Sequence, residues 1–81
     1  MKWYKIEQGQ ITIIEDYLEM LKELEKTKGV IFEVFPSGYI VIRRASKVGL
    51  HNIGIPFDAL KKMYEIACSV KEKGGMSDGF H

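Results

Sequence analysis

The sequence predicts an α+β fold in which a small antiparallel sheet of three or four strands is packed on one face by two helices. Two segments, 13–28 and 59–73, carry apolar residues at a period near 3.6, which is typical of amphipathic helices. Residues 30–44 alternate on either side of a short turn, which predicts a β-hairpin. With a short first strand at 2–7, the predicted order is β-α-β-β-(β)-α. Because each helical stripe needs a sheet face to cover, both helices are expected on the same side.

The N-terminal segment predicts a strand followed by a turn. Residues 2–7 alternate loosely, with Tyr4 and Ile6 on one face and Trp3 on the other. The sequence QGQ at 8–10 is typical of a turn or loop.

The first helix carries signals at both ends. Thr12 followed three residues later by Glu15 matches a capping box, in which the hydroxyl and the carboxylate each accept from the other residue's backbone N–H. Gly29 suits the left-handed position just beyond a C-terminus, so the helix is expected to end near Thr27 or Lys28.

The hairpin turn can be predicted from the stretch FPSGY at 35–39. Pro36 and Ser37 suit the central positions of a type I turn, and Gly38 suits the left-handed residue that follows, which places Phe35 opposite Tyr39. A one-residue slip would mix Glu33 into the apolar set, so burial favours this register. One face then carries Val30, Phe32, Val34, Ile40 and Ile42, and the other carries Ile31, Glu33, Phe35, Tyr39, Val41 and Arg43. The wholly apolar face is expected to point toward the helices.

The C-terminal part predicts a loop, a helix and a tail. Residues 45–54 are interpreted as a loop, and a further strand toward Ile53 and Ile55 is left open. The helix at 59–73 has Asp58 as its expected N-cap and is stopped by two glycines. The predicted domain is therefore 1–73, with a flexible tail at 74–81.

Size and composition limit the classes of protein. With 81 residues and a mass of 9.3 kDa, the chain is expected to form a single domain with a small core. A formal charge of +1 and a pI near 7.8 do not favour polyphosphate or anionic lipid as a partner. The single cysteine excludes an internal disulfide, which favours self-association as the source of extra stability. No signal peptide or membrane span is recognised, so a cytoplasmic protein that does not contact membranes is expected.

Enzymatic and cofactor chemistry is weakly indicated. His51 and Cys68 could form a nucleophilic pair, but Cys68 falls at the edge of an apolar stripe, where a small buried thiol is common. The histidines and the cysteine have no metal-ligand spacing, and Gly49 and Gly54 match no phosphate-binding loop. We therefore expect a non-enzyme without a metal or a cofactor.

Two binding hypotheses remain, and both use the outer face of the hairpin. The first is a small interaction module of the regulator or inhibitor type, expected to be a homodimer, which binds a macromolecular partner, most simply a protein. The second is a single-stranded nucleic-acid-binding dimer, because aromatic and basic side chains occur together there. The candidate partner-binding residues are Phe35, Tyr39, Val41, Arg43, Arg44 and Lys47.

One stretch of the chain resembles a known family. GYIVIRRASK, followed after a loop by IGIPFDALKKMYEI, is similar to the end of the PC4-type coactivator domain, where a strand with basic residues at its end precedes a short strand and a capped helix. The resemblance implies a dimer that grips single strands on curved sheets, with Arg43, Arg44 and Lys47 touching phosphates. It covers about 35 residues, and the helix at 13–28 has no counterpart in that domain.

Overall fold

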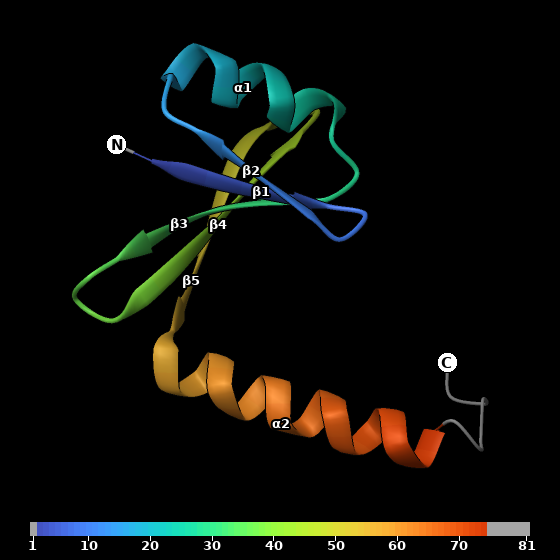
Figure 1. The fold of residues 1–81 in the computed structure, drawn as a ribbon. Coiled ribbons are helices and arrows are strands. Elements are labelled where there is room, and N and C mark those ends of the chain that lie inside the picture. The colour runs from blue at the N-terminus through green and yellow to red at the C-terminus, as the bar shows by residue number, and fades with distance from the viewer. Residues whose placement is uncertain (1, 75–81) are drawn as a thin grey trace.

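The computed structural model describes residues 2–74 and shows a five-stranded antiparallel sheet with two helices (Figure 1). The strands lie in the order β2-β1-β3-β4-β5. The elements are β1 (Trp3–Glu7), β2 (Gln10–Ile14), α1 (Tyr17–Lys26), β3 (Val30–Phe35), β4 (Tyr39–Ser46), β5 (Gly49–Pro56) and α2 (Phe57–Gly74). The α+β class is confirmed, but there are five strands where three or four were predicted. Of the predicted tail, all but Gly74 lies outside the described residues.

The second strand replaces the predicted start of the first helix. Gln8 and Gly9 both have positive φ, at 53° and 79°, and they turn the chain back so that β2 pairs with β1. In this register Trp3 lies opposite Ile14. The capping-box prediction is therefore wrong: Thr12 is a strand residue, because its isoleucine neighbours gain more from pairing along β1 than from a helical turn.

Helix α1 begins later than predicted and is held at both ends. The side chain of Asp16, not that of Thr12, is the N-cap and accepts a hydrogen bond from the backbone N–H of Glu19 at 2.9 Å. The helix ends near the predicted position, but Gly29 is needed for a different reason. A Cβ there would lie 2.0 Å from the carbonyl oxygen of Ile6, so only glycine lets the chain pass this close to β1.

The β3–β4 hairpin has the predicted register. Phe35 pairs with Tyr39 and Phe32 pairs with Ile42. The N–H of Gly38 donates to the carbonyl of Phe35 at 2.9 Å, and Gly38 has φ of 117°, as a type I turn followed by a left-handed residue requires.

Residues 45–55, which the sequence left open, extend one strand and form most of another. β4 continues to Ser46, and β5 pairs with it along its whole length, from Tyr39 opposite Pro56 to Ser46 opposite Gly49. The connection at 47–48 is two residues long. β5 is consequently an edge strand of eight residues.

The prediction that the wholly apolar face of the hairpin points toward the helices is wrong for α1. Helix α1 packs on the other face, where Ile31 is only 1% exposed and Glu33 is 7% exposed. The buried core beneath α1 consists of Trp3, Ile14, Met20, Leu24 and Ile31, with Leu21 and Ala45 packed against it.

Contributions from outside the hairpin explain this choice of face. Trp3 and Ile14 add large apolar side chains to the Ile31 side, and only the β1–β2 pairing brings them there. The one charged residue in the way, Glu33, is neutralised by Arg43. The hairpin pattern alone does not contain the contribution of Trp3 and Ile14.

Helix α2 does not join α1 on its side of the sheet. It starts directly after β5 without a linker and extends away from the strands (Figure 1). Only its beginning approaches the sheet, where Leu60 meets Phe32 and Ile42 on the side opposite α1. The prediction that both helices cover one face is therefore wrong. The radius of gyration, 14.9 Å, exceeds the value of about 12 Å for a compact domain of this length.

Candidate binding surfaces

Arg43 lies inside the fold and pairs with neighbouring side chains. Its guanidinium donates to Glu33 and, at 2.9 Å, to the side-chain oxygen of Asn52 on β5. The carboxyl side chain of Glu33 is 9% exposed and that of Arg43 is 22% exposed. Because this charge is already neutralised by an internal partner, Arg43 has a structural role and is poorly placed to bind a phosphate.

A cavity of about 210 Å³ lies between α1 and the β4–β5 ribbon, beside Arg43. Trp3, Tyr17 and Leu50 contribute to its walls. Two buried donors, the Nε1 of Trp3 and the Nε of Arg43, have no hydrogen-bond partner among the described residues. Three of its eight lining residues, Trp3, Met20 and Leu24, belong to the α1 core, so this cavity borders the helix–sheet packing.

Three of the predicted partner-binding residues do lie together. Phe35, Tyr39 and Val41 share the α1 side of the sheet, in the half of the β3–β4 hairpin next to its turn. This turn lies away from α1 (Figure 1). Phe35 is 37% exposed and Tyr39 is 47% exposed. A Cβ at Gly54 would lie 3.9 Å from Cδ2 of Tyr39, so the Tyr39 ring lies over the glycine of β5. We call Phe35, Tyr39 and Val41 the hairpin-end surface.

A backbone hydrogen bond holds the end of the hairpin that carries these rings. The backbone N–H of Phe57, the first residue of α2, donates to the carbonyl of Gly38 at 2.9 Å. This bond ties the turn of the β3–β4 hairpin to the junction between β5 and α2. The aromatic rings are therefore mounted on paired strands and not on a free loop.

The remaining two predicted residues lie elsewhere. Arg44 follows Arg43 along β4, so its side chain points to the opposite face of the sheet. Lys47 lies in the turn at the far end of β4, roughly 25 Å along the strand from Tyr39. In the same region the Oγ of Ser46 lies 2.8 Å from Nε2 of His51. The six predicted residues thus do not form one patch, and the basic groups are separated from the aromatic ones.

A second surface, which the sequence reasoning assigned to the interior, is the face of the sheet opposite α1. Three cross-strand rows build it; one runs through all five strands as Ile13, Tyr4, Phe32, Ile42 and Ile53. The rings of Tyr4 and Phe32 are stacked with centroids 5.4 Å apart. The apolar sheet face comprises Tyr4, Ile6, Ile11, Ile13, Val30, Phe32, Val34, Ile40, Ile42, Ile53 and Ile55.

The outer strands of this face were missed because their patterns are short. Isoleucines two residues apart, at 11 and 13 and again at 53 and 55, are the signal that could have identified both strands. Ile13 was interpreted as part of the first helix, Ile11 was assigned to no element, and the second pair lay in the segment left open.

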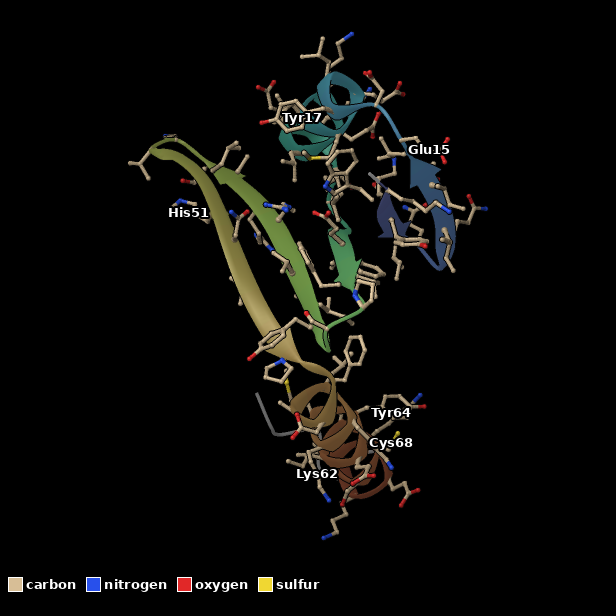
Figure 2. The ribbon with its side chains drawn as sticks, turned by 90° about the vertical axis from the view of Figure 1, so that its left-hand side faces the viewer. Glu15, Tyr17, His51, Lys62, Tyr64 and Cys68 are labelled. Atoms are coloured by element: carbon tan, nitrogen blue, oxygen red, sulfur yellow. The ribbon has the colours of Figure 1, made fainter. Side chains whose placement is uncertain are left out.

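The possible nucleophilic pair of His51 and Cys68 is not formed. His51 lies on β5 near the β4–β5 turn, and Cys68 lies on α2 at the opposite end of the molecule (Figure 2). The residues that the structure describes also contain no group of three or more histidine, cysteine or acidic side chains that could hold a metal ion. Neither helix within residues 2–74 is long and apolar enough to cross a bilayer.

One further ion pair connects α1 to the sheet. The Nζ of Lys5 on β1 donates to Glu23 on α1 at 2.8 Å, and both side chains are largely shielded from solvent. The hydrogen bond to Glu23 is the main reason that the pKa of Lys5 is raised above its usual value. The same bond lowers the pKa of Glu23. When both groups are charged, this pair holds α1 over the α1 core.

Comparison with known proteins finds no matching family model, no matching curated protein and no matching solved structure for this chain.

Proposed function

We propose that this protein is a non-enzymatic interaction module that binds a protein partner through the hairpin-end surface. The observation that carries the proposal is the position of Phe35, Tyr39 and Val41 on one side of the hairpin, where the rings of Phe35 and Tyr39 are exposed and Val41 is partly buried. Aromatic rings of this kind are enriched at protein interfaces because they bury a large area at a low cost in conformational entropy.

The rigid support favours recognition of a preformed partner surface. Little ordering of the backbone is needed when the strands are paired and the turn is tied to α2. Single-stranded nucleic acid, the other hypothesis, would need basic groups beside the stacking rings. The nearest arginine, Arg43, is engaged with Glu33, and Lys47 lies at the other end of the strand.

The test is affinity capture from the native host, followed by calorimetry with the purified captured protein. Tyr39→Glu places a charge in the middle of the surface and should weaken binding at least about thirtyfold, as is typical for a central interface residue. Tyr39→Phe keeps the ring and is the matched control, with an expected change of less than about threefold.

Equal capture by the wild type and Tyr39→Glu would contradict the proposal. A titration with a single-stranded oligonucleotide at two ionic strengths separates the other hypothesis, because phosphate binding must weaken steeply with salt. Tight, salt-sensitive oligonucleotide binding would also contradict a protein partner as the main ligand.

A further inference from the structure

The apolar sheet face is too large to be left in water by a stable small domain. Ile53 is 50% exposed and belongs to the row that runs through all five strands. Ile11 is 67% exposed and belongs to a row that is apolar through Ile6 and Val30, beyond which Arg44 and His51 occupy β4 and β5. Scattered single apolar residues are normal on a surface, but a continuous face spanning five strands marks an interface. Within the described chain, α1 lies on the other side and α2 reaches this face only with Leu60.

The same chain carries an uncovered helix that matches this face. Met63 is 51% exposed, Ile66 is 63% exposed and Val70 is 45% exposed, although all three lie on the apolar side of α2. At about 100° per residue, the apolar positions from Phe57 to Val70 cover an arc of roughly 200°. A helix that packs on one surface needs an arc of only about 100°. Helix α2 can therefore contact two neighbours at once.

The chain cannot bring its own α2 onto its own apolar sheet face without breaking the helix. β5 ends at Pro56 and α2 begins at Phe57, so no linker residue is available to reverse the direction of the chain. The N–H of Phe57 is fixed to the carbonyl of Gly38, which sets the direction in which the helix leaves the sheet. The later turns of α2 are directed away from the strands (Figure 1).

The exposed area fits a dimer of this chain. The accessible surface is 6509 Å², whereas a compact monomer of this mass exposes about 5,000 Å². If the eight residues outside 2–74 are assigned the accessible area of an extended chain and subtracted, the rest still exposes about 600 Å² more than a compact monomer of its mass. Two chains therefore have roughly 1,200 to 3,000 Å² to bury, which is the range of stable protein interfaces.

We infer that two copies of this chain form a reciprocal dimer in which α2 of each copy packs on the apolar sheet face of the other. A two-fold axis makes the two contacts identical and covers both the apolar sheet face and the apolar stripe of α2 in each chain. At about 1.5 Å per residue, the 18 residues of α2 span roughly 27 Å, and five strands are about 19 Å wide. The helix is thus long enough to cross the whole face.

In this dimer, the part of the apolar stripe of α2 that does not contact the partner's sheet faces the partner's α2. With one part of the stripe on the partner's sheet, the other part can pack against the partner's α2 between the two sheets. This arrangement uses Tyr64, which is 70% exposed, as well as Met63 and Val70. The hairpin-end surface is on the other side of the sheet and stays open, so this inference does not depend on the proposed function.

The test combines two variants that damage different halves of the contact. Ile53→Glu places a charge on the apolar sheet face, and Val70→Glu places one on the stripe of α2. Sedimentation equilibrium of the wild type should show a dimer, and each variant alone should weaken dimerisation at least about thirtyfold, because both copies of the contact are damaged. Mixing the two variants should restore dimers, because the heterodimer keeps one contact between an unchanged sheet and an unchanged helix.

Two control variants separate position from charge. Thr12→Glu lies on the opposite face of β2, and Ser69→Glu lies on the polar side of α2, so both should dimerise like the wild type. A monomeric wild type, variants that still form dimers, or a mixture that stays monomeric would each overturn the inference.

A measurement on the unmodified chain covers the case in which the variants fail to fold. Isotope-filtered nuclear Overhauser spectra of a mixture of labelled and unlabelled wild type should show contacts between α2 of one chain and the Tyr4 and Phe32 rings of the other. Their absence in a dimeric sample would mean that the copies associate elsewhere, and the inference would be wrong. Capture experiments with Tyr39→Glu report separately on the hairpin-end surface.

Discussion

The two helices differ more than their sequences suggest. Helix α1 has ten residues, yet Met20 and Leu24 are buried over the sheet and its cap is satisfied. Helix α2 has eighteen residues and a wider apolar arc, yet its side chains remain largely exposed. An amphipathic pattern therefore shows that a helix has an apolar side to bury. The connection to the preceding strand decides whether that side can reach the sheet of its own chain.

The connections explain the contrast in direct terms. A two-residue link containing Asp16, the N-cap, lets α1 turn back over Trp3 and Ile14 after β2. No linker residue precedes α2. The sheet then has one face that α1 covers and one face that its own chain leaves largely uncovered, and the predictions below address the two faces in turn.

The largest effect is expected from truncating the covered face. Ile31→Ala removes a side chain that is 1% exposed and should lower the free energy of unfolding by about 2 to 5 kcal/mol. Because its contacts lie within one chain, the loss should not depend on protein concentration. Ile53→Ala is the counterpart on the other face, and its cost should be under about 1 kcal/mol in dilute solution and should rise with concentration. Urea denaturation at several concentrations measures both, and equal behaviour of the two variants would remove the distinction between the faces.

A somewhat smaller effect is expected from the ion pair under α1. Arg43→Met leaves the carboxylate of Glu33 nearly buried and unpaired, which should cost about 2 to 3 kcal/mol, below the cost of breaking a fully buried pair. Adding Glu33→Leu should recover more than half of the loss, because an apolar pair fits the same site. The check is a double-mutant cycle from denaturation midpoints, and a fully additive cycle would show that the pair is not coupled.

A substitution at Gly29 tests how closely the chain after α1 passes β1. A Cβ at this position meets the Ile6 carbonyl oxygen at 2.0 Å, so Gly29→Ala should destabilise by about 1 to 3 kcal/mol through forced backbone movement. Gly54→Ala is the matched control, because its nearest neighbour is the Tyr39 ring at 3.9 Å. The thermal midpoint should fall for the first variant and stay nearly constant for the second. A tolerated alanine at 29 would mean that the chain passes β1 at a greater distance.

The smallest effect is the pH dependence of the Lys5–Glu23 pair. The pKa of Glu23 is lowered in the folded protein, so its stabilisation is present above the usual glutamate pKa and is lost as the pH falls through the folded value. The pKa of Lys5 is raised, so its part is present below the usual lysine pKa of 10.5 and is lost as the pH rises beyond it. Lys5→Met should flatten both limbs of a plot of unfolding free energy against pH. An unchanged acid limb would assign the acid sensitivity to other carboxylates.

Local patterns were sufficient for part of the fold. The FPSGY turn predicted the β3–β4 register, because proline restricts φ at position 36 and glycine readily adopts the positive φ at position 38. The period of the apolar residues predicted the end of α1 and most of α2. The predicted terminal residues were wrong, because Asp58 lies inside α2 and is not its N-cap, and Gly29 is not among the glycines with positive φ. The N-cap at Asp16 was missed because Thr12 and Glu15 offered an equally good local pattern. Only the pairing of β2 with β1, which makes Thr12 a strand residue, excludes Thr12 as the cap.

The choice of face could not be predicted from the hairpin. Its more apolar side was expected to be buried, but burial beneath α1 is decided jointly by Trp3, Ile14 and Ile31, which come together only after three strands have paired. Arg43 was counted among the partner-binding residues, but it pairs with Glu33 and with Asn52, which lay in the segment with no assigned strand. Of the predicted partner-binding residues, Phe35, Tyr39 and Val41 lie together in the structure, whereas Arg44 and Lys47 lie apart from them.

Hydrogen exchange followed at two protein concentrations tests most directly that one helix is covered by its own chain and the other by a second copy. Backbone amides of α1 should exchange at the same slow rate at both concentrations. Amides in the later turns of α2 should exchange quickly in dilute solution and become strongly protected as the concentration rises. Protection of α2 that is independent of concentration, or equally absent at both concentrations, would contradict the reciprocal dimer.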